Sequence, residues 1–171
     1  MSTPRIPNLR ALPVALFLSF AIFSSNLALQ AKNPPSDACE MLPAGQLTKV
    51  LEQPFGAPKK STAPAAFLDS PTGTDCTYQT RSGRSRTVLF RIYVESSPAA
   101  AQKTFKRLSA YYGPNKAVTG NWDSAYLDAS HAIHVQKGNV RYYLNLDPTG
   151  SDKAKADKQL TDLATSIAGQ L

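Results

Sequence analysis

Two cysteines, Cys39 and Cys76, carry the most definite chemistry in this 171-residue sequence. They lie too far apart for a C-x-x-C redox motif, and with two cysteines only one pairing exists. In an oxidising compartment an isolated pair is far more often a disulfide than a metal site or a nucleophile. We therefore predict a structural disulfide between Cys39 and Cys76, which closes a loop of about 38 residues.

The sequence contains two histidines, His131 and His134. On a strand, a spacing of three places them on opposite faces, so they cannot share one metal ion without distortion. Asp123 and Asp128 could join one of them, but a zinc site would still lack ligands. We therefore predict neither a metal site nor a cofactor. We expect His131 at the edge of the core and His134 on an exposed face.

The sequence contains many serines, so the residues of a Ser-His-Asp triad are available. It has no G-x-S-x-G motif, however, which marks the nucleophile of many serine hydrolases. Neither histidine lies in a catalytic motif, and we name no catalytic residue. Two function classes remain. The favoured one is a non-catalytic binding or envelope-associated protein, whose partner is an envelope protein, a polymer or a small ligand. The alternative is a small accessory hydrolase of the cell envelope.

Three arginines, Arg81, Arg84 and Arg86, gather at a predicted turn, separated by serines and a glycine. Guanidinium groups this close together can bind one anion. The plainer interpretation is a solvated turn whose charges deter edge-to-edge pairing of strands. We keep the three arginines as candidate contacts of an anionic ligand.

The first 31 residues have the pattern of a secretory signal. Arg5 and Arg10 precede an apolar run that ends at Phe23, and the segment closes on the small residue Ala31. The apolar core of about 12 residues is shorter than the roughly 20 that a helix needs to cross a bilayer. We expect cleavage near Ala31 and export to the periplasm or the medium. An uncleaved N-terminal anchor is the alternative.

The formal net charge is +7, and removal of Arg5 and Arg10 with the signal leaves +5. This basic balance favours anionic partners such as envelope polymers or lipid headgroups. We do not expect nucleic acid as a partner, because the chain is exported and has no nucleic-acid-binding motif. After cleavage we expect no transmembrane span, a short linker at 32–36 and a single disulfide-closed domain at 37–171.

Periodicity and breaker residues divide the expected domain into helices and strands. Asp37 and Glu40 have the spacing of a helix-capping box, and Pro43 interrupts the helix that they begin. Gly138 and Asn139 predict a tight hairpin turn. The proline-rich segment 54–75 is expected to be a long loop from which Phe67 and Leu68 reach the core. Expected helices span about 37–53, 98–112 and 152–169, and expected strands span 76–80, 87–95, 124–128, 132–137 and 140–147.

The order of these elements indicates an α+β domain. We predict a two-layer sandwich, with an antiparallel sheet of about five strands and helices on one face. Counting back from the hairpin turn pairs Gln136 with Arg141 and His134 with Tyr143 on the polar face. Such a mixture of side chains is typical of recognition surfaces, although ordinary cross-strand pairs are the alternative. The candidate binding face comprises Arg91, Tyr93, His134, Gln136, Arg141, Tyr143 and Asn145.

The string DACEMLPAGQLTKVLEQPFG, followed by DCTY, an amphipathic strand and an alanine-rich helix, resembles a class of small exported bacterial α+β domains of unknown function. Many of those are envelope lipoproteins, often of actinobacteria. The resemblance implies a disulfide between the first helix and the first strand, and it implies no catalytic residue. This chain has no cysteine directly after its apolar segment, so we do not expect lipid attachment.

Overall fold

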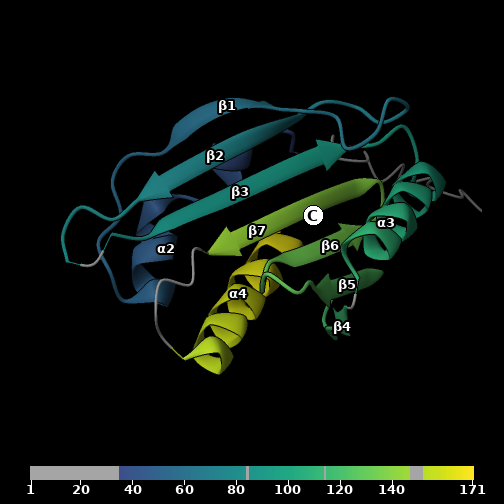
Figure 1. Cartoon of the computed structure of the whole chain (residues 1–171). Helices are drawn as coiled ribbons and strands as arrows, with labels where there is room; N and C mark the ends of the chain where they lie inside the picture. Colours follow the sequence, from purple (N-terminus) through teal and green to yellow (C-terminus); the bar gives the residue numbers. More distant parts are fainter. Residues whose placement is uncertain (1–34, 84, 114, 147–151) are drawn as a thin grey trace, which may run out of the picture. The chain divides into compact units, whose positions relative to one another are not determined.

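The computed structural model describes residues 35–83, 85–113, 115–146 and 152–171, which form an α+β domain. The expected signal segment and its cleavage site lie outside these residues. Every described element belongs to the compact unit Asn33–Leu171. The elements in chain order are α1 (Ala38–Met41), α2 (Ala44–Leu51), β1 (Lys59–Ala63), β2 (Gly73–Gln79), β3 (Thr87–Val94), α3 (Pro98–Tyr112), β4 (Lys116–Ala117), β5 (Ser124–Leu127), β6 (Ile133–Lys137), β7 (Val140–Leu146) and α4 (Lys153–Ala168) (Figure 1).

The strands form one open antiparallel sheet in the order β1-β2-β3-β7-β6-β5-β4. It consists of two runs of consecutive strands, β1 to β3 and β4 to β7, which meet where β3 pairs with β7. Along this β3–β7 seam, Arg91 lies opposite Tyr143, and Tyr93 lies opposite Arg141. The predicted register of the β6–β7 hairpin, with His134 opposite Tyr143, is confirmed. Both predicted hairpins therefore share one sheet.

One face of the sheet forms the main core with α1, α2 and α4. Strand alternation places apolar side chains on this face, and α4 covers them with Leu160, Leu163 and Ile167, which are fully buried. Burial of each such side chain contributes about 1.5–3 kcal/mol. The sheet side of this core includes Cys76, Tyr78, Val88, Phe90, Ile92, Ile133, Val135, Tyr142 and Leu144.

The predicted disulfide is confirmed, and it ties α1 to the sheet. Cys39 of α1 is bonded to Cys76 of β2, with their Cα atoms 5.2 Å apart. The carboxylate of Asp37 caps α1 by accepting a hydrogen bond from the backbone N–H of Cys39 at 2.9 Å. Pro43 stands at the N-cap of α2, so the expected first helix is split at this proline.

Helix α3 lies on the opposite face from the other helices (Figure 1). The ring of Phe105 packs 5.1 Å from that of Tyr126, and the ring of Tyr112 packs 5.2 Å from that of His134. The expectation of helices on one face is therefore right for α1, α2 and α4 and wrong for α3. An amphipathic helix shows in its sequence that one side is buried, but not which face of the sheet buries it.

The sheet has seven strands in the described residues, where about five were expected. Strand β1 lies within the segment that was expected to be a loop, and it pairs with β2 from Lys59 opposite Thr77 to Ala63 opposite Gly73. Four of its five residues are exposed, so it shows no alternation of burial. It is an edge strand, which explains both its polar composition and the missing pattern.

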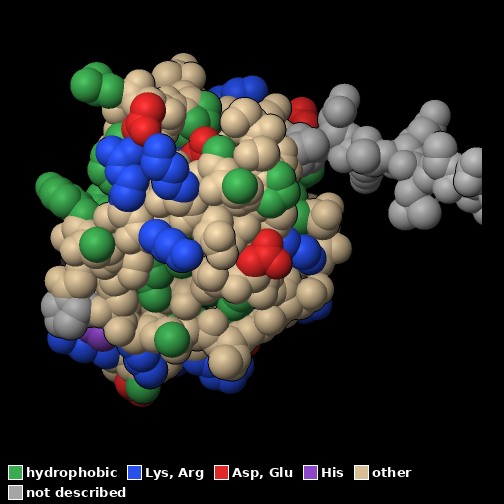
Figure 2. Space-filling model, turned by 90° about the vertical axis from the view of Figure 1, so that its right-hand side faces the viewer, with side chains coloured by type: hydrophobic (Ala, Val, Ile, Leu, Met, Phe, Trp, Pro, Cys, Tyr) green, Lys and Arg blue, Asp and Glu red, His purple; other side chains and the backbone are tan. Residues whose placement is uncertain are grey.

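Residues between β1 and β2 cross the second face of the sheet near α3. Phe67 is half-buried there, but Leu68 is fully exposed, so the expectation that Leu68 reaches the core is wrong. Figure 2 shows hydrophobic side chains that protrude on this side of the domain. Among the described residues, no helix is long and apolar enough to cross a membrane.

Candidate functional site

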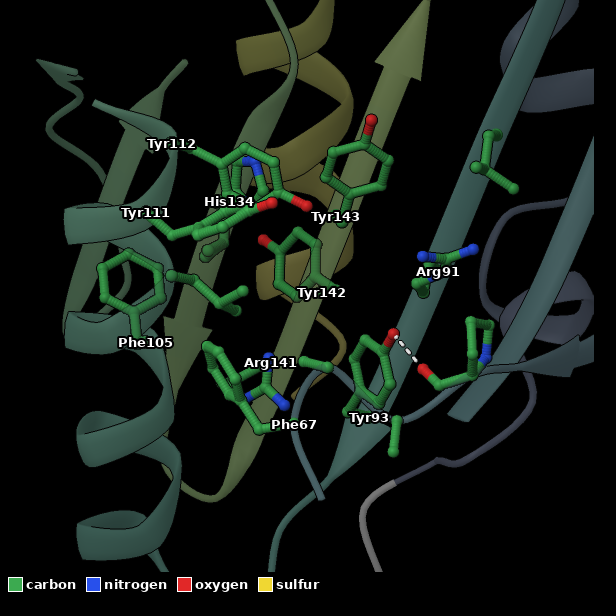
Figure 3. Close-up of a pocket in the computed structure, with 16 residues that line it drawn as sticks. Phe67, Arg91, Tyr93, Phe105, Tyr111, Tyr112, His134, Arg141, Tyr142 and Tyr143 are labelled. Atoms are coloured by element: carbon green, nitrogen blue, oxygen red, sulfur yellow. Dashed lines mark hydrogen bonds between the residues drawn. The ribbon is translucent and has the colours of Figure 1, made fainter. Parts of the chain in front are cut away.

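A cavity of about 520 Å³ opens on the second face of the sheet, and we call it the sheet pocket (Figure 3). Its floor is formed by β3, β6 and β7, one side by α3 and the other by residues 64–67. Its volume is in the range of about 300–1,000 Å³ that is usual for small-ligand sites. Its lining includes the aromatic residues Phe67, Tyr93, Phe105, Tyr111, Tyr112 and Tyr143 and the basic residues Arg91, His134 and Arg141.

Most of the predicted binding face lies in the wall of this pocket. The residues of that face that line it are Arg91, Tyr93, His134, Arg141 and Tyr143. The expected exposure is wrong, because α3 and residues 64–67 cover the face. Tyr93, His134, Gln136 and Arg141 are all buried, with at most 6% of their surface exposed. These predicted residues therefore lie on a concave surface, where we had expected an open one.

Arg141 forms a buried ion pair in the wall of the pocket. Its Nε and Nη2 atoms donate hydrogen bonds to the same oxygen of Glu95, at 2.8 and 2.6 Å. Both side chains are at least 96% buried. The guanidinium carbon also lies 4.7 Å from the centre of the Tyr93 ring, where a cation–π contact adds to the pairing. The charge of Arg141 is therefore neutralised within the protein.

Arg91 is neutralised in the same way by Asp75, its neighbour on β2. Its Nε and Nη2 atoms donate to the two carboxylate oxygens of Asp75 at 2.6 and 2.7 Å. This fork-to-fork geometry is the strongest arrangement for an arginine and a carboxylate. This pairing holds Arg91 in the wall of the pocket.

His134, expected on an exposed face, is buried and held between aromatic rings and an acid. Its Nε2 atom lies 2.9 Å from Oδ2 of Asp128. The imidazole stacks on Tyr126 with ring centres 4.6 Å apart, and the ring of Tyr143 meets it at 4.8 Å, edge to face. These contacts fix the ring in the wall of the pocket.

Asp128 is the anchor of this arrangement. Burial alone would raise the pKa of its carboxyl group, but hydrogen bonds from His134, Ser130 and the backbone of Ala132 outweigh burial and lower this pKa to about 2. Asp128 is thus ionised at neutral pH. The hydroxyl of Ser130 donates to the acid and not to the histidine.

Two tyrosine hydroxyls set the polar character of the floor. The hydroxyl of Tyr93 donates to the carbonyl of Pro64 at 2.9 Å and so ties the crossing segment to the sheet. The hydroxyl of Tyr143 accepts a hydrogen bond from Asn145 at 2.8 Å, and its own proton remains available to a ligand. Burial raises the pKa of both tyrosines, so both are protonated at neutral pH. Asn145 therefore acts by positioning Tyr143.

The remaining predicted candidates lie elsewhere. Gln136 donates to Asp123 and to the carbonyl of Gly138, and so supports the β6–β7 turn. His131 lies in the turn before β6, and its Nδ1 atom is 2.8 Å from Asp157 of α4. Within the part of the chain that the structure describes, no three His, Cys, Asp or Glu side chains gather closely enough to hold a metal ion.

The arginines of the β2–β3 turn do not meet the sheet pocket. Arg84 lies outside the described residues. Arg81 is exposed, and Arg86 is half-buried beside a smaller cavity of about 240 Å³ between the end of α2 and the start of α4. Their role as anion contacts stays a prediction.

Five aromatic residues of the pocket, among them Tyr142 of β7, were not named as site residues from the sequence. Phe105 and Tyr112 belong to the expected helix at 98–112, which packs on the other face of the sheet from the one predicted. Tyr111 lies in the same helix and is exposed. Phe67 lies beneath the guanidinium of Arg107, 3.8 Å from its ring centre. The adjacent tyrosines at the end of the expected helix are the signal in the sequence that could have pointed to these residues.

Comparison with known proteins adds no identity: no protein-family model matches the chain, and no curated protein matches it.

Proposed function

We propose that this chain is an exported, non-catalytic binding protein that holds a small, uncharged and largely apolar ligand in the sheet pocket. The observation that carries this proposal is the pairing of every basic group in the described pocket wall. Arg91, Arg141 and His134 each contact a carboxylate. The pocket therefore offers no excess positive charge to an anion, although the chain as a whole is basic.

The shape and lining of the pocket favour an apolar ligand with one or two hydrogen-bond acceptors. Aromatic side chains on α3, β3 and β7 present rings from opposite sides of the cavity (Figure 3). A ligand between them gains from burial of apolar surface. The hydroxyl of Tyr143 supplies a donor that orients the ligand, as is usual in pockets with few polar groups.

Two observations support export. The Cys39–Cys76 disulfide is the kind of bond that persists in oxidising compartments. The first 31 residues have the composition of a secretory signal. On the same grounds we propose that the chain belongs to the class of exported bacterial domains with a single disulfide between the first helix and the sheet.

The alternative function, an accessory hydrolase, has one observation in its favour. The His134–Asp128 pair lies at the wall of the pocket, as a catalytic pair would. A hydrolase of this type also needs a nucleophile within reach of the histidine. No Ser, Thr or Cys is among the described residues that line the pocket, so binding without catalysis is the better-supported function.

The test uses the chain from Asn33 onward and an uncharged fluorescent probe of apolar surfaces, N-phenyl-1-naphthylamine. Ala66 lines the pocket, and Ala66→Trp fills it, so we expect at least tenfold weaker probe binding. Ala154→Trp makes the same substitution at an exposed position of α4 and serves as the control. Melting curves confirm that both variants are folded. Equal probe binding by the two variants, or no binding by the unmodified chain, would contradict the proposal.

A further inference from the structure

The exposed large hydrophobic side chains of the described residues gather at the mouth of the sheet pocket. They are Leu68, Tyr111 and Tyr112, with exposures of 109%, 76% and 42%. Both tyrosines line the pocket, and Leu68 directly follows Phe67, which lines it too. A single exposed leucine needs no explanation, but an apolar cluster around one opening marks an interaction surface.

Contacts of the neighbouring loop residues fix the position of Leu68. Its neighbours on either side both bind Arg107 of α3: the ring of Phe67 lies 3.8 Å from the guanidinium, and Asp69 accepts hydrogen bonds from it at 2.7 and 2.9 Å. A backbone hydrogen bond from Ser70 to the carbonyl of Phe67 closes the turn. Leu68 is therefore held at the tip of an anchored turn, with its side chain in solvent.

The surface around these side chains is basic. Helix α3 carries Lys103, Lys106 and Arg107, all exposed, and has no acidic residue. Asp69 is the acidic partner of Lys103 and Arg107 and offsets one of the three charges. Figure 2 shows Lys and Arg side chains close to the protruding hydrophobic ones. We call the six residues Leu68, Lys103, Lys106, Arg107, Tyr111 and Tyr112 the rim.

We propose that the rim docks on the surface of an anionic lipid bilayer. Leu68 and the two tyrosines would enter the boundary between headgroups and acyl chains, where amphipathic tyrosine rings are favoured. Lysine and arginine side chains reach headgroup phosphates with their charged ends while their stems stay in apolar surroundings. Each basic residue near such a surface contributes about 1 kcal/mol, or about fivefold in partitioning.

The positive charge of the rim favours an anionic bilayer over a second copy of the chain. A symmetric dimer through the rim would bring Lys103, Lys106 and Arg107 of one copy against the same residues of the other. Like charges oppose that contact, whereas an anionic bilayer satisfies the cations and the apolar side chains together. Docking in this orientation would also open the sheet pocket toward the membrane, and this last consequence rests on the proposed function.

The test measures sedimentation of the chain from Asn33 onward with vesicles of phosphatidylcholine, with and without 30% phosphatidylglycerol, at low salt. We expect binding to the anionic vesicles only. Leu68→Ser should weaken it by about tenfold, because a leucine leaves the apolar boundary. Lys103→Gln with Lys106→Gln should weaken it by about twentyfold. Lys49→Gln with Lys153→Gln removes the same charge from α2 and α4 and should change binding by less than threefold.

The outcomes separate docking from ligand binding. None of the substituted residues lines the sheet pocket, so each variant should bind N-phenyl-1-naphthylamine like the unmodified chain. Failure of probe binding with intact vesicle binding would refute the proposed function alone. Equal effects of the two lysine pairs, or no preference for anionic vesicles, would overturn docking. A concentration-dependent dimer that Leu68→Ser dissociates would assign the rim to a second copy instead.

Discussion

Arg141 on β7 and Glu95, the residue that follows β3, form a buried ion pair in which two guanidinium nitrogens share one carboxylate oxygen. Glu95→Gln would leave the cation buried without a counter-charge. We expect the free energy of unfolding, measured with urea, to fall by about 3–5 kcal/mol. Replacing both residues by apolar ones, Glu95→Leu with Arg141→Met, should restore most of the loss. A double variant as unstable as the single one would show that the pair itself stabilises the fold.

Asp128 makes stability depend on acid pH. Its pKa in the folded chain is about 2, below the usual value of 3.8. The unfolded chain therefore takes up the proton first as the pH falls, and about 2 kcal/mol of stability is lost between about pH 4 and pH 2. Asp128→Asn should be less stable than the unmodified chain at pH 6, and its urea-unfolding free energy should change less over this acid range.

A control for the acid dependence is Asp162→Asn on the exposed side of α4. Asp162 bonds only Lys158 across one helical turn, a pair of small value in water. We expect this variant to keep the acid dependence of the unmodified chain. The assignment to Asp128 would be wrong if Asp128→Asn and the unmodified chain lost stability in parallel from pH 4 to pH 2.

The disulfide between Cys39 and Cys76 restricts the unfolded chain. Its loop of about 38 residues corresponds to about 4 kcal/mol in the chain-entropy model. Replacing both cysteines by serine should lower the unfolding free energy by a comparable amount. Thiol labelling of the denatured, unreduced chain from Asn33 onward should find no reactive thiol. Two labelled thiols per chain in material from the exported fraction would contradict the predicted compartment.

Gly73 and Gly45 form a matched pair for the same substitution. A Cβ at Gly73, where β2 begins, would lie 2.2 Å from the backbone oxygen of Ile92, whereas a Cβ at Gly45 would meet nothing within 4 Å. Gly73→Ala should destabilise the chain by about 1–3 kcal/mol, because backbone has to move. Gly45→Ala, within α2, should stabilise it by up to about 1 kcal/mol. Equal melting temperatures would contradict both expectations.

Local signals in the sequence predicted the parts of the fold that depend on neighbours along the chain. The turn at Gly138 and Asn139 predicted the register of the β6–β7 hairpin, and the capping box at Asp37 and Glu40 predicted where the first expected helix begins. Strand β1 was missed because only Ala63 is buried among its residues. A period of two appears in a sequence only when one face of the strand is buried along its length.

The concave site could be predicted only in part. Alternation placed Arg91, His134 and Arg141 on one face, and polar residues on a strand usually face water. Their carboxylate partners are 16, 6 and 46 residues away in the sequence, on other strands or turns. The acidic partners of these basic side chains can be identified only once the strand order is known. Because the charges are then seen to be paired, a helix can be expected to cover this face.

The β3–β7 seam sets the order in which this fold can assemble. The strands on either side of it pair with their neighbours in sequence, whereas the seam joins residues as far apart as Val88 and Leu146, across the whole of α3. Closing such a long loop is entropically costly, so we expect the seam to form after the two runs of strands. The pocket floor spans the seam and exists only once it has closed. We therefore expect a ligand of the proposed kind to slow the separation of the two halves, and to slow hydrogen exchange most at the backbone amides along the seam.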